Sequence, residues 1–304
     1  MNKFIKKAFT LIELLVVIAI IGILSGLIVV SMGGVTQKAN IAKAQVFSNS
    51  LKNSLMLNLV SEWKFDQINI PEVNQTPDSW GNINTGTLVG ATHLPVLKNE
   101  SDCIRGKCLQ FDGTEDYINC GSNISLNNTD KVTLEIWAKY IGNHNTADNH
   151  DQFFIVREGA YRGAYLFGFY DNHITLYGSH DGTVWTWIAT NSKTYGSSGD
   201  TNWHHFVGTI DKDSGAKIYV DGVLAGQDSD TGTIKSEPSA ILYIGKRNIQ
   251  YFEGYLDEVR IYKDVVSISQ IRNNFYSGLN SLLINGGITQ EDYLSRLNNY
   301  ASNN

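Results

Sequence analysis

Proline, cysteine and methionine are scarce in this sequence. Its 304 residues include 4 prolines, 3 cysteines and 3 methionines. Three cysteines, without the spacing of a zinc site, exclude a small scaffold held together by disulfides or metal. Basic residues are also in the minority, and the net charge is −6. This charge argues against nucleic acid as a partner, because broad nucleic-acid binding requires a basic surface.

Catalytic motifs are missing as well. A glycosidase needs two carboxylates at one bond, but Asp257 and Glu258 are adjacent, and adjacent residues of a strand face opposite sides of the sheet. For the same reason, His204 and His205 should face opposite sides of a strand and should not both bind one metal ion. Neither a G-x-S-x-G nor an H-E-x-x-H sequence occurs. The sequence therefore predicts a protein that is not an enzyme.

Glycine and aromatic residues are abundant instead. The 28 glycines and 11% aromatic residues favour strands joined by tight turns. Between Leu59 and Tyr262, short alternating apolar segments are separated by turn residues, and Asp221-Gly222 is typical of a two-residue hairpin turn. No long segment with helical periodicity intervenes. This pattern excludes parallel β-α-β units and favours an antiparallel β-sandwich.

The N-terminus combines positive charge with a long apolar segment. Three lysines precede the segment from Phe9 to Met32, which contains one charge, Glu13. As a helix this segment would be about 36 Å long, enough to cross a membrane. The lysines predict that the N-terminus stays in the cytoplasm while the rest is exported. A carboxylate inside a bilayer is costly, so Glu13 should have a partner.

The residues from Lys6 to Leu24 resemble the N-terminal signal of type IV pilins and type II secretion pseudopilins. The resemblance implies that prepilin peptidase cleaves between Ala8 and Phe9, that Phe9 becomes N-methylated, and that Glu13 pairs with a neighbouring subunit during assembly. The family usually has glycine where this chain has Ala8. We therefore expect a prepilin leader at 1–8 and a transmembrane and stem helix at 9–58.

The order of the strand-like segments resembles the concanavalin A-like, or laminin-G-like, family. The segments are EWKFD (62–66), DSWGN (78–82), GKCLQFDG (106–113), DY (116–117), TLEIW (133–137), WHHFVGT (203–209), IYVDG (218–222) and LDEVRIY (256–262). The resemblance implies an all-β jelly-roll sandwich, which we expect at 59–278, often with a structural calcium. A helical tail should follow at 279–304, and caps at Ser267 and Thr289 predict two helices, the first ending near Tyr276.

Three aspartates on these segments are candidate calcium ligands. Asp66, Asp112 and Asp257 lie on strands that meet near one edge of this fold, and carboxylates are suitable ligands for calcium. The alternatives are that Asp112-Gly113 forms an ordinary turn and that Asp257 binds Arg260 or a backbone amide.

Two tryptophans are candidates for ligand binding. Trp185 and Trp187 share one face if they lie on a strand, and Tyr170 and Tyr177 lie on nearby segments. Such aromatic rings either stack on a sugar or fill the core between two sheets.

The cysteines leave two pairings open. Export permits oxidation. A Cys103–Cys108 disulfide would close a short loop, whereas Cys108 and Cys120 would face each other across a hairpin centred near Thr114. One thiol remains free in either case.

Together, these features predict a pilin-like surface protein, a minor pilin or pseudopilin, that displays a carbohydrate- or surface-binding domain. One alternative is a pseudopilin of a type II secretion or DNA-uptake machine that recognises cargo, and another is a membrane-tethered glycan hydrolase. The expected partners are prepilin peptidase, other pilin subunits, the inner membrane, and a carbohydrate or a host or environmental surface. We expect a single-pass protein of the cytoplasmic membrane that is later exposed in a pilus or pseudopilus.

Overall fold

The computed structural model describes residues 58–67, 74–142, 151–159, 164–180 and 187–302, together with Val16 and Ile18. The chain divides into two units, Met1–Leu57 and Asn58–Asn304, and the second is described below. No helix among the described residues is long and apolar enough to cross a membrane. The transmembrane and stem helix expected at 9–58 lies almost entirely outside those residues.

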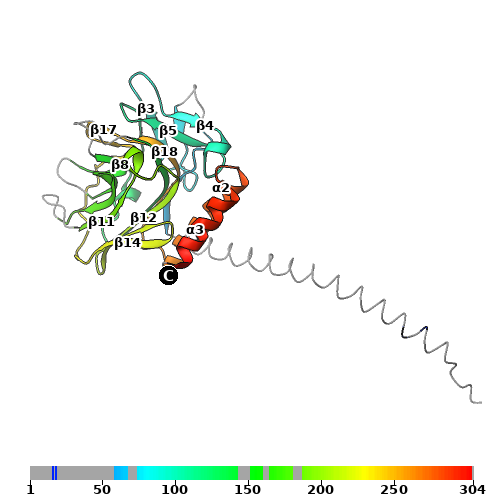
Figure 1. Cartoon of the computed structure of the whole chain (residues 1–304). Coiled ribbons are helices and arrows are strands. Elements are labelled where there is room, and N and C mark those ends of the chain that lie inside the picture. Colours follow the sequence, from blue (N-terminus) through cyan, green and yellow to red (C-terminus); the bar gives the residue numbers. More distant parts are fainter. Residues whose placement is uncertain are drawn as a thin grey trace, which may run out of the picture. The chain divides into compact units, whose positions relative to one another are not determined.

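The second unit consists of short strands followed by two α-helices (Figure 1). The strands are β1 (Leu59–Trp63), β2 (Gln75–Thr76), β3 (Gly86–Val89), β4 (Val96–Lys98), β5 (Cys108–Asp112), β6 (Tyr117–Asn119), β7 (Lys131–Tyr140), β8 (Asp151–Arg157), β9 (Tyr165–Tyr170), β10 (His173–Gly178), β11 (Trp187–Thr194), β12 (His204–Asp211), β13 (Gly215–Val220), β14 (Val223–Asp228), β15 (Leu242–Ile244), β16 (Lys246–Arg247), β17 (Gln250–Tyr251) and β18 (Glu253–Tyr262). The α-helices are α2 (Ile268–Ile284) and α3 (Gln290–Ser302), and the 3-10 helices are η1 (Glu100–Asp102), η2 (Ile124–Leu126) and η3 (Gly196–Ser198).

Two antiparallel sheets form the sandwich. Sheet A has the order β14-β13-β12-β7-β18-β5-β4, with β1 also paired to β18, and sheet B has the order β11-β10-β9-β8-β15-β6-β3-β2. The last strand, β18, lies between β7 and β5, so residues from opposite ends of the domain become neighbours. The predicted antiparallel sandwich is confirmed.

The core lies between the two sheets and follows the alternation of each strand. In β7, Leu134 and Ile136 point into this core, while Trp137 packs on the opposite, outer side. Aromatic rings dominate the core. Phe154 of sheet B, for example, has its ring centre 5.9 Å from that of Phe206 of sheet A. Burying one such side chain contributes about 2–3 kcal/mol.

The predicted hairpin turn is present at Asp221-Gly222. Val220 pairs with Val223, and Asp221 and Gly222 have φ angles of 52° and 80°. Two positive φ angles are what a type I′ turn requires, and this turn matches the twist of the flanking strands.

Helix α2 is longer than the sequence predicts. Ser267 caps it by accepting a hydrogen bond from the Gln270 amide, but the helix continues past Tyr276 to Ile284, across the boundary expected at 278. The reason is its packing on sheet A. A Cβ atom at Gly278 would lie 2.3 Å from the Trp137 ring, so glycine here allows the close approach. The expected cap of α3 is present, because Thr289 Oγ1 accepts from the Asp292 amide.

Candidate functional site

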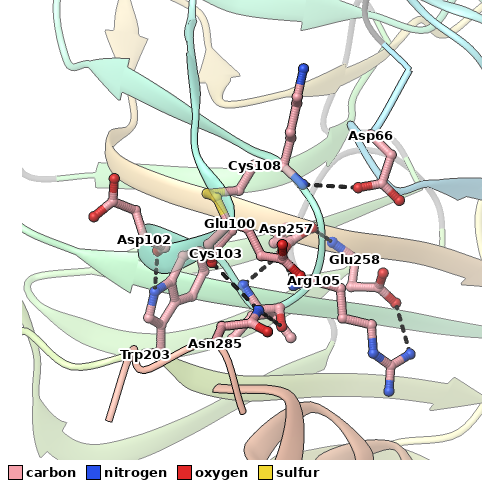
Figure 2. Close-up of a disulfide and its surroundings, with 12 residues drawn as sticks. Asp66, Glu100, Asp102, Cys103, Arg105, Cys108, Trp203, Asp257, Glu258 and Asn285 are labelled. Atoms are coloured by element: carbon pink, nitrogen blue, oxygen red, sulfur yellow. Dashed lines mark hydrogen bonds and ion pairs between the residues drawn. A yellow bond between two sulfur atoms is a disulfide. The ribbon is translucent and has the colours of Figure 1, made fainter. Parts of the chain in front are cut away.

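The loop from Cys103 to Cys108, called here the disulfide loop, is closed by a Cys103–Cys108 disulfide (Figure 2). This is one of the two predicted pairings. Both cysteines are fully buried, and Cys120 is a separate, buried free thiol. The two ends of the disulfide loop are therefore buried in the domain, while Lys107 between them is exposed.

Two of the predicted calcium ligands hold the disulfide loop by its backbone (Figure 2). Asp257 Oδ2 accepts hydrogen bonds from the amides of Ile104 (2.9 Å) and Arg105 (3.1 Å). Asp66 Oδ1 accepts from the Lys107 amide at 2.9 Å. Burial, together with the charge of Glu258, raises the pKa of Asp257 well above its usual range. Asp257 therefore anchors the loop through its backbone amides.

Asp112 does not join these two aspartates. Its Oδ1 accepts from the Thr114 amide and hydroxyl, each at 2.8 Å, which is the ordinary turn that the sequence left open. The described residues contain no group of three metal-ligating side chains. Asp66, Asp112 and Asp257 therefore do not form such a group in the described part of the chain, and calcium binding at these residues stays a prediction.

A β-bulge overturns one argument from strand alternation. The pairing of β18 with β7 shifts between Asp257 and Arg260, and Glu258 has a φ angle of 51°. Both carboxylates consequently reach Arg105: Asp257 accepts from its amide, and Glu258 Oε2 lies 3.9 Å from Arg105 Nη1. Adjacent acids thus share one side of β18, buried beneath the disulfide loop.

Several predicted site residues lie outside the described residues. These are Ala8, Phe9 and Glu13 of the N-terminal signal, and Trp185. The backbone of Trp187 begins β11, but its side chain is not among those described. The stacking role expected for these tryptophans stays a prediction.

The outer face of sheet B and the neighbouring β16–β17 hairpin carry a row of tyrosines, which we call the tyrosine surface. It consists of Tyr117, Tyr170, Tyr177, Tyr243 and Tyr251. The strand register explains the row: Tyr243 lies opposite Val156, Val156 opposite Leu166, and Leu166 opposite Tyr177. Directly opposed residues share a face of the sheet. Tyr243 separates the core residues Leu242 and Ile244 and must therefore point outward.

Cationic side chains lie among these rings. Lys246 Nζ is 4.0 Å from the centre of the Tyr117 ring, 5.4 Å from Tyr251 and 5.7 Å from Tyr243. Tyr170 and Tyr177 meet edge to face at 6.1 Å, and Tyr170 is 48% exposed. The result is a partly exposed platform of apolar ring faces with polar edges.

The outer face of sheet A is occupied by a buried polar network. Glu135 is fully buried. Its carboxylate accepts hydrogen bonds from Arg260 Nη1 (3.0 Å), Tyr262 (3.0 Å) and Asn274 of α2, and it lies 3.1 Å from His205 Nε2. Burial alone would raise the pKa of Glu135, but the attraction of Arg260 and the hydrogen bonds lower it to about 2.

Sequence reasoning missed the tyrosine surface. It considered Tyr170 and Tyr177 only as neighbours of the tryptophans and did not consider Tyr117, Tyr243, Lys246 or Tyr251. The sequence did contain part of the pattern, since Tyr243 lies between two apolar residues that belong to the core. Which strands lie beside Tyr243 is decided only by the sheet order.

Comparison with known proteins agrees with this architecture. The family described as the concanavalin A-like lectin/glucanases superfamily matches residues 112–272, more than half of the chain, and the chain belongs to this superfamily. The prokaryotic N-terminal methylation motif matches residues 4–29, so the chain also carries a type IV pilin signal. No curated protein matches the sequence significantly.

Several solved structures with a similar fold are binding domains of toxins. The binding domain of Paraclostridial Mosquitocidal Protein 1 has 19% identity and a TM-score of 0.56, over 74% of this chain and 53% of that chain. The ligand-binding domain of botulinum neurotoxin serotype D, solved with N-acetylneuraminic acid, has 14% identity and a TM-score of 0.55, over 75% and 52%. Similarity at these identities establishes the fold alone, and it spans about half the length of those structures.

Proposed function

We propose that the protein is a pilin-type subunit that displays its sandwich as a carbohydrate-binding module, with the tyrosine surface as the binding face. The observation that carries this proposal is the row of partly exposed tyrosines around Lys246. The type IV pilin signal supports export and display at the cell surface. Membership of a superfamily of lectins and glucanases supports a carbohydrate as the ligand.

The chemistry of the tyrosine surface suits a glycan. Sugar rings have one apolar face that stacks on an aromatic ring, while their hydroxyls need polar partners at the ring edge. Tyr117, Tyr243 and Tyr251 supply ring faces, and Lys246 supplies donors. Arg247 extends the surface, with its guanidinium carbon 5.4 Å from the centre of the Phe153 ring and its Nε bound to Glu158. A chain of several sugars could follow this row across the sheet.

A glycan array probed with the full chain in detergent tests the binding face. We expect Tyr117→Ala to weaken binding of the best glycan at least tenfold, because it removes a stacking platform. The matched control is Tyr255→Ala on sheet A, where Lys139 lies 5.4 Å from the tyrosine ring. Equal binding by the wild type and both variants would show that the tyrosine surface is not the site.

Processing and assembly are proposed from the N-terminal signal. Prepilin peptidase should cleave between Ala8 and Phe9, and mass spectrometry of the membrane-extracted protein should find N-methyl-Phe9 as the terminus. Glu13→Leu should leave the protein in the membrane but reduce its incorporation into filaments, since a carboxylate in the bilayer is costly unless it has a partner. An unprocessed Met1 in cells with active peptidase would contradict the pilin role without affecting glycan binding.

A further inference from the structure

A cavity of about 450 Å³ opens between the sandwich and the C-terminal helices. Its walls come from β11 and the η3 segment, the start of β12, the β13–β14 hairpin, and α2 and α3. The charged and polar residues that matter here are Lys193, Tyr195, Asp200, His204, Asp221 and Arg296. None of them belongs to the tyrosine surface, so this cavity is a separate place on the domain.

Tyr195 leaves a hydrogen-bonding group unused in this cavity. Its side chain is 1% exposed, and its ring is held by Phe169 and Phe206, with ring centres 5.4 Å and 5.3 Å away. The hydroxyl has no hydrogen-bond partner in the described part of the chain. Buried hydroxyls almost always have a partner, because an unmade hydrogen bond costs free energy. Tyr195 lines the cavity, so its hydroxyl is an unused hydrogen-bonding group beside that space.

His204 lies between two carboxylates beside Tyr195. Its Nδ1 is 2.7 Å from Asp221 Oδ2, and its Nε2 is 3.1 Å from Asp200 Oδ2, although the latter contact is not aligned as a hydrogen bond. Burial alone would lower the pKa of His204, but the attraction of Asp221 and Asp200 raises it. The imidazole separates the two carboxylates, so the three groups cannot surround one metal ion.

The carboxylates of the cavity are already in use. Asp200 accepts from Lys193 Nζ (2.7 Å) and from the amide and side chain of Asn202 (2.9 and 2.8 Å). Asp221 Oδ1 accepts from the His205 amide at 2.9 Å. The lining combines the basic residues Lys193, His204 and Arg296 with the acidic residues Asp200, Asp221 and Asp292. A ligand with a net charge would gain little attraction here.

We propose that this cavity binds an uncharged, hydroxyl-bearing ligand the size of a monosaccharide or disaccharide. A ligand hydroxyl both donates and accepts, so it can bind the Tyr195 hydroxyl and still donate to the lone pairs left on Asp200 or Asp221. The guanidinium of Arg296 donates from Nη1 to the Trp203 carbonyl at 2.7 Å, and its other nitrogens carry further donors. Val220, Val223 and Ala225 provide an apolar wall for the carbon skeleton.

The site depends on the C-terminal helix as well as on the sandwich. Asp292, Ser295 and Arg296 all come from α3, and α3 lies beyond the part of the chain matched by the superfamily. The site therefore includes residues outside that matched segment. It is independent of the tyrosine surface and can be tested separately.

The test is calorimetric titration of the full chain in detergent with glucose, galactose and mannose, each compared with its uronic acid and its 2-amino derivative. We expect at least one neutral sugar to bind at least tenfold more tightly than both charged derivatives. Tyr195→Phe should weaken that binding at least tenfold. The same variant should not lower the melting temperature of the ligand-free protein, because the removed hydroxyl has no protein partner to lose.

A control variant separates this site from the tyrosine surface. Tyr117→Ala should leave the titration unchanged, whereas it should reduce binding on the glycan array. Three results would overturn the proposal: no Tyr195-dependent binding of any neutral sugar, tighter binding of a charged derivative, or a lower melting temperature for Tyr195→Phe with unchanged binding. The last result would assign the hydroxyl to a bound water that supports the fold.

Discussion

Sheets A and B share one core, but their outer faces differ. On sheet A, helix α2 packs over Trp137 and Val207 through Phe275 and Ile271, so this face is buried. On sheet B, tyrosines occupy equivalent outward positions and stay partly exposed. Figure 1 shows both helices on the side of β12 and β18, away from β8 and β17. One outer face is therefore covered by a helix, while the other leaves tyrosines partly exposed beside a buried cluster of Phe153, Val156 and Leu166.

Two buried carboxylates, one on each sheet, also differ in their pKa values. Glu135 on sheet A has cationic and hydroxyl partners, and its pKa is about 2. Asp116, which precedes Tyr117 of sheet B, is also buried and accepts hydrogen bonds from the backbone amide of Asp112. Burial and the nearby charge of Asp112 raise the pKa of Asp116 to about 7. Burial alone does not decide the charge of an acid, because its partners can reverse the direction of the shift.

The largest effect should come from breaking the network under α2. Glu135→Gln should reduce the free energy of unfolding by about 3 kcal/mol at pH 7, since it removes the buried charge to which Arg260, Tyr262 and Asn274 donate hydrogen bonds. Urea denaturation followed by tryptophan fluorescence measures this loss. The control is Glu291→Gln on the exposed side of α3, which should change stability by only a few tenths of a kcal/mol. A small effect of Glu135→Gln would mean that α2 is held by apolar packing alone.

Asp116 should make the free energy of unfolding depend on pH in the opposite direction to Glu135. Its folded pKa lies above that of an unfolded aspartate, so the folded state retains a proton that the unfolded state loses. Stability should therefore fall as pH rises from about 4 to 7, by up to about 3 kcal/mol. Asp116→Asn should remove this decline. Glu135 has a lowered pKa, so the stability that it contributes should instead be lost as pH falls from about 4.5 towards 2. An unchanged pH profile for Asp116→Asn would contradict the assignment.

Removing the disulfide should have an intermediate effect. The Cys103→Ser/Cys108→Ser variant should lose about 2 kcal/mol, the loop-closure value for so short a loop. Reductant should bring the wild type to the stability of this variant during denaturation and leave the variant unchanged. A response of the variant to reductant would point to Cys120 instead.

The smallest effect on stability should come from the tyrosine surface. Tyr117→Ala should cost less than about 1 kcal/mol, because it removes an exposed cation–π contact with Lys246, while glycan binding falls tenfold. A loss of several kcal/mol would place Tyr117 in the structural core and remove the contrast between the two faces.

Features that depend on neighbouring residues could be predicted from the sequence. The strand alternation, the Asp221-Gly222 turn and the caps at Ser267 and Thr289 all follow from local backbone preferences. The roles of Asp66 and Asp257 could not, because their partners lie 41 and 152 residues away. The cavity residue Asp221 was predicted only as part of a turn, since its contact with His204 requires β12 and β13 to pair.

The sequence by itself determined the pilin-type signal and an antiparallel sandwich, because both are encoded in contiguous residues and in a period of two. Only the tertiary structure decided which outer face α2 covers, that Asp257 anchors a loop, and that tyrosines from separate strands form one surface. The physical reason is that burial, charge state and binding geometry depend on distances between segments, and the sheet order sets those distances.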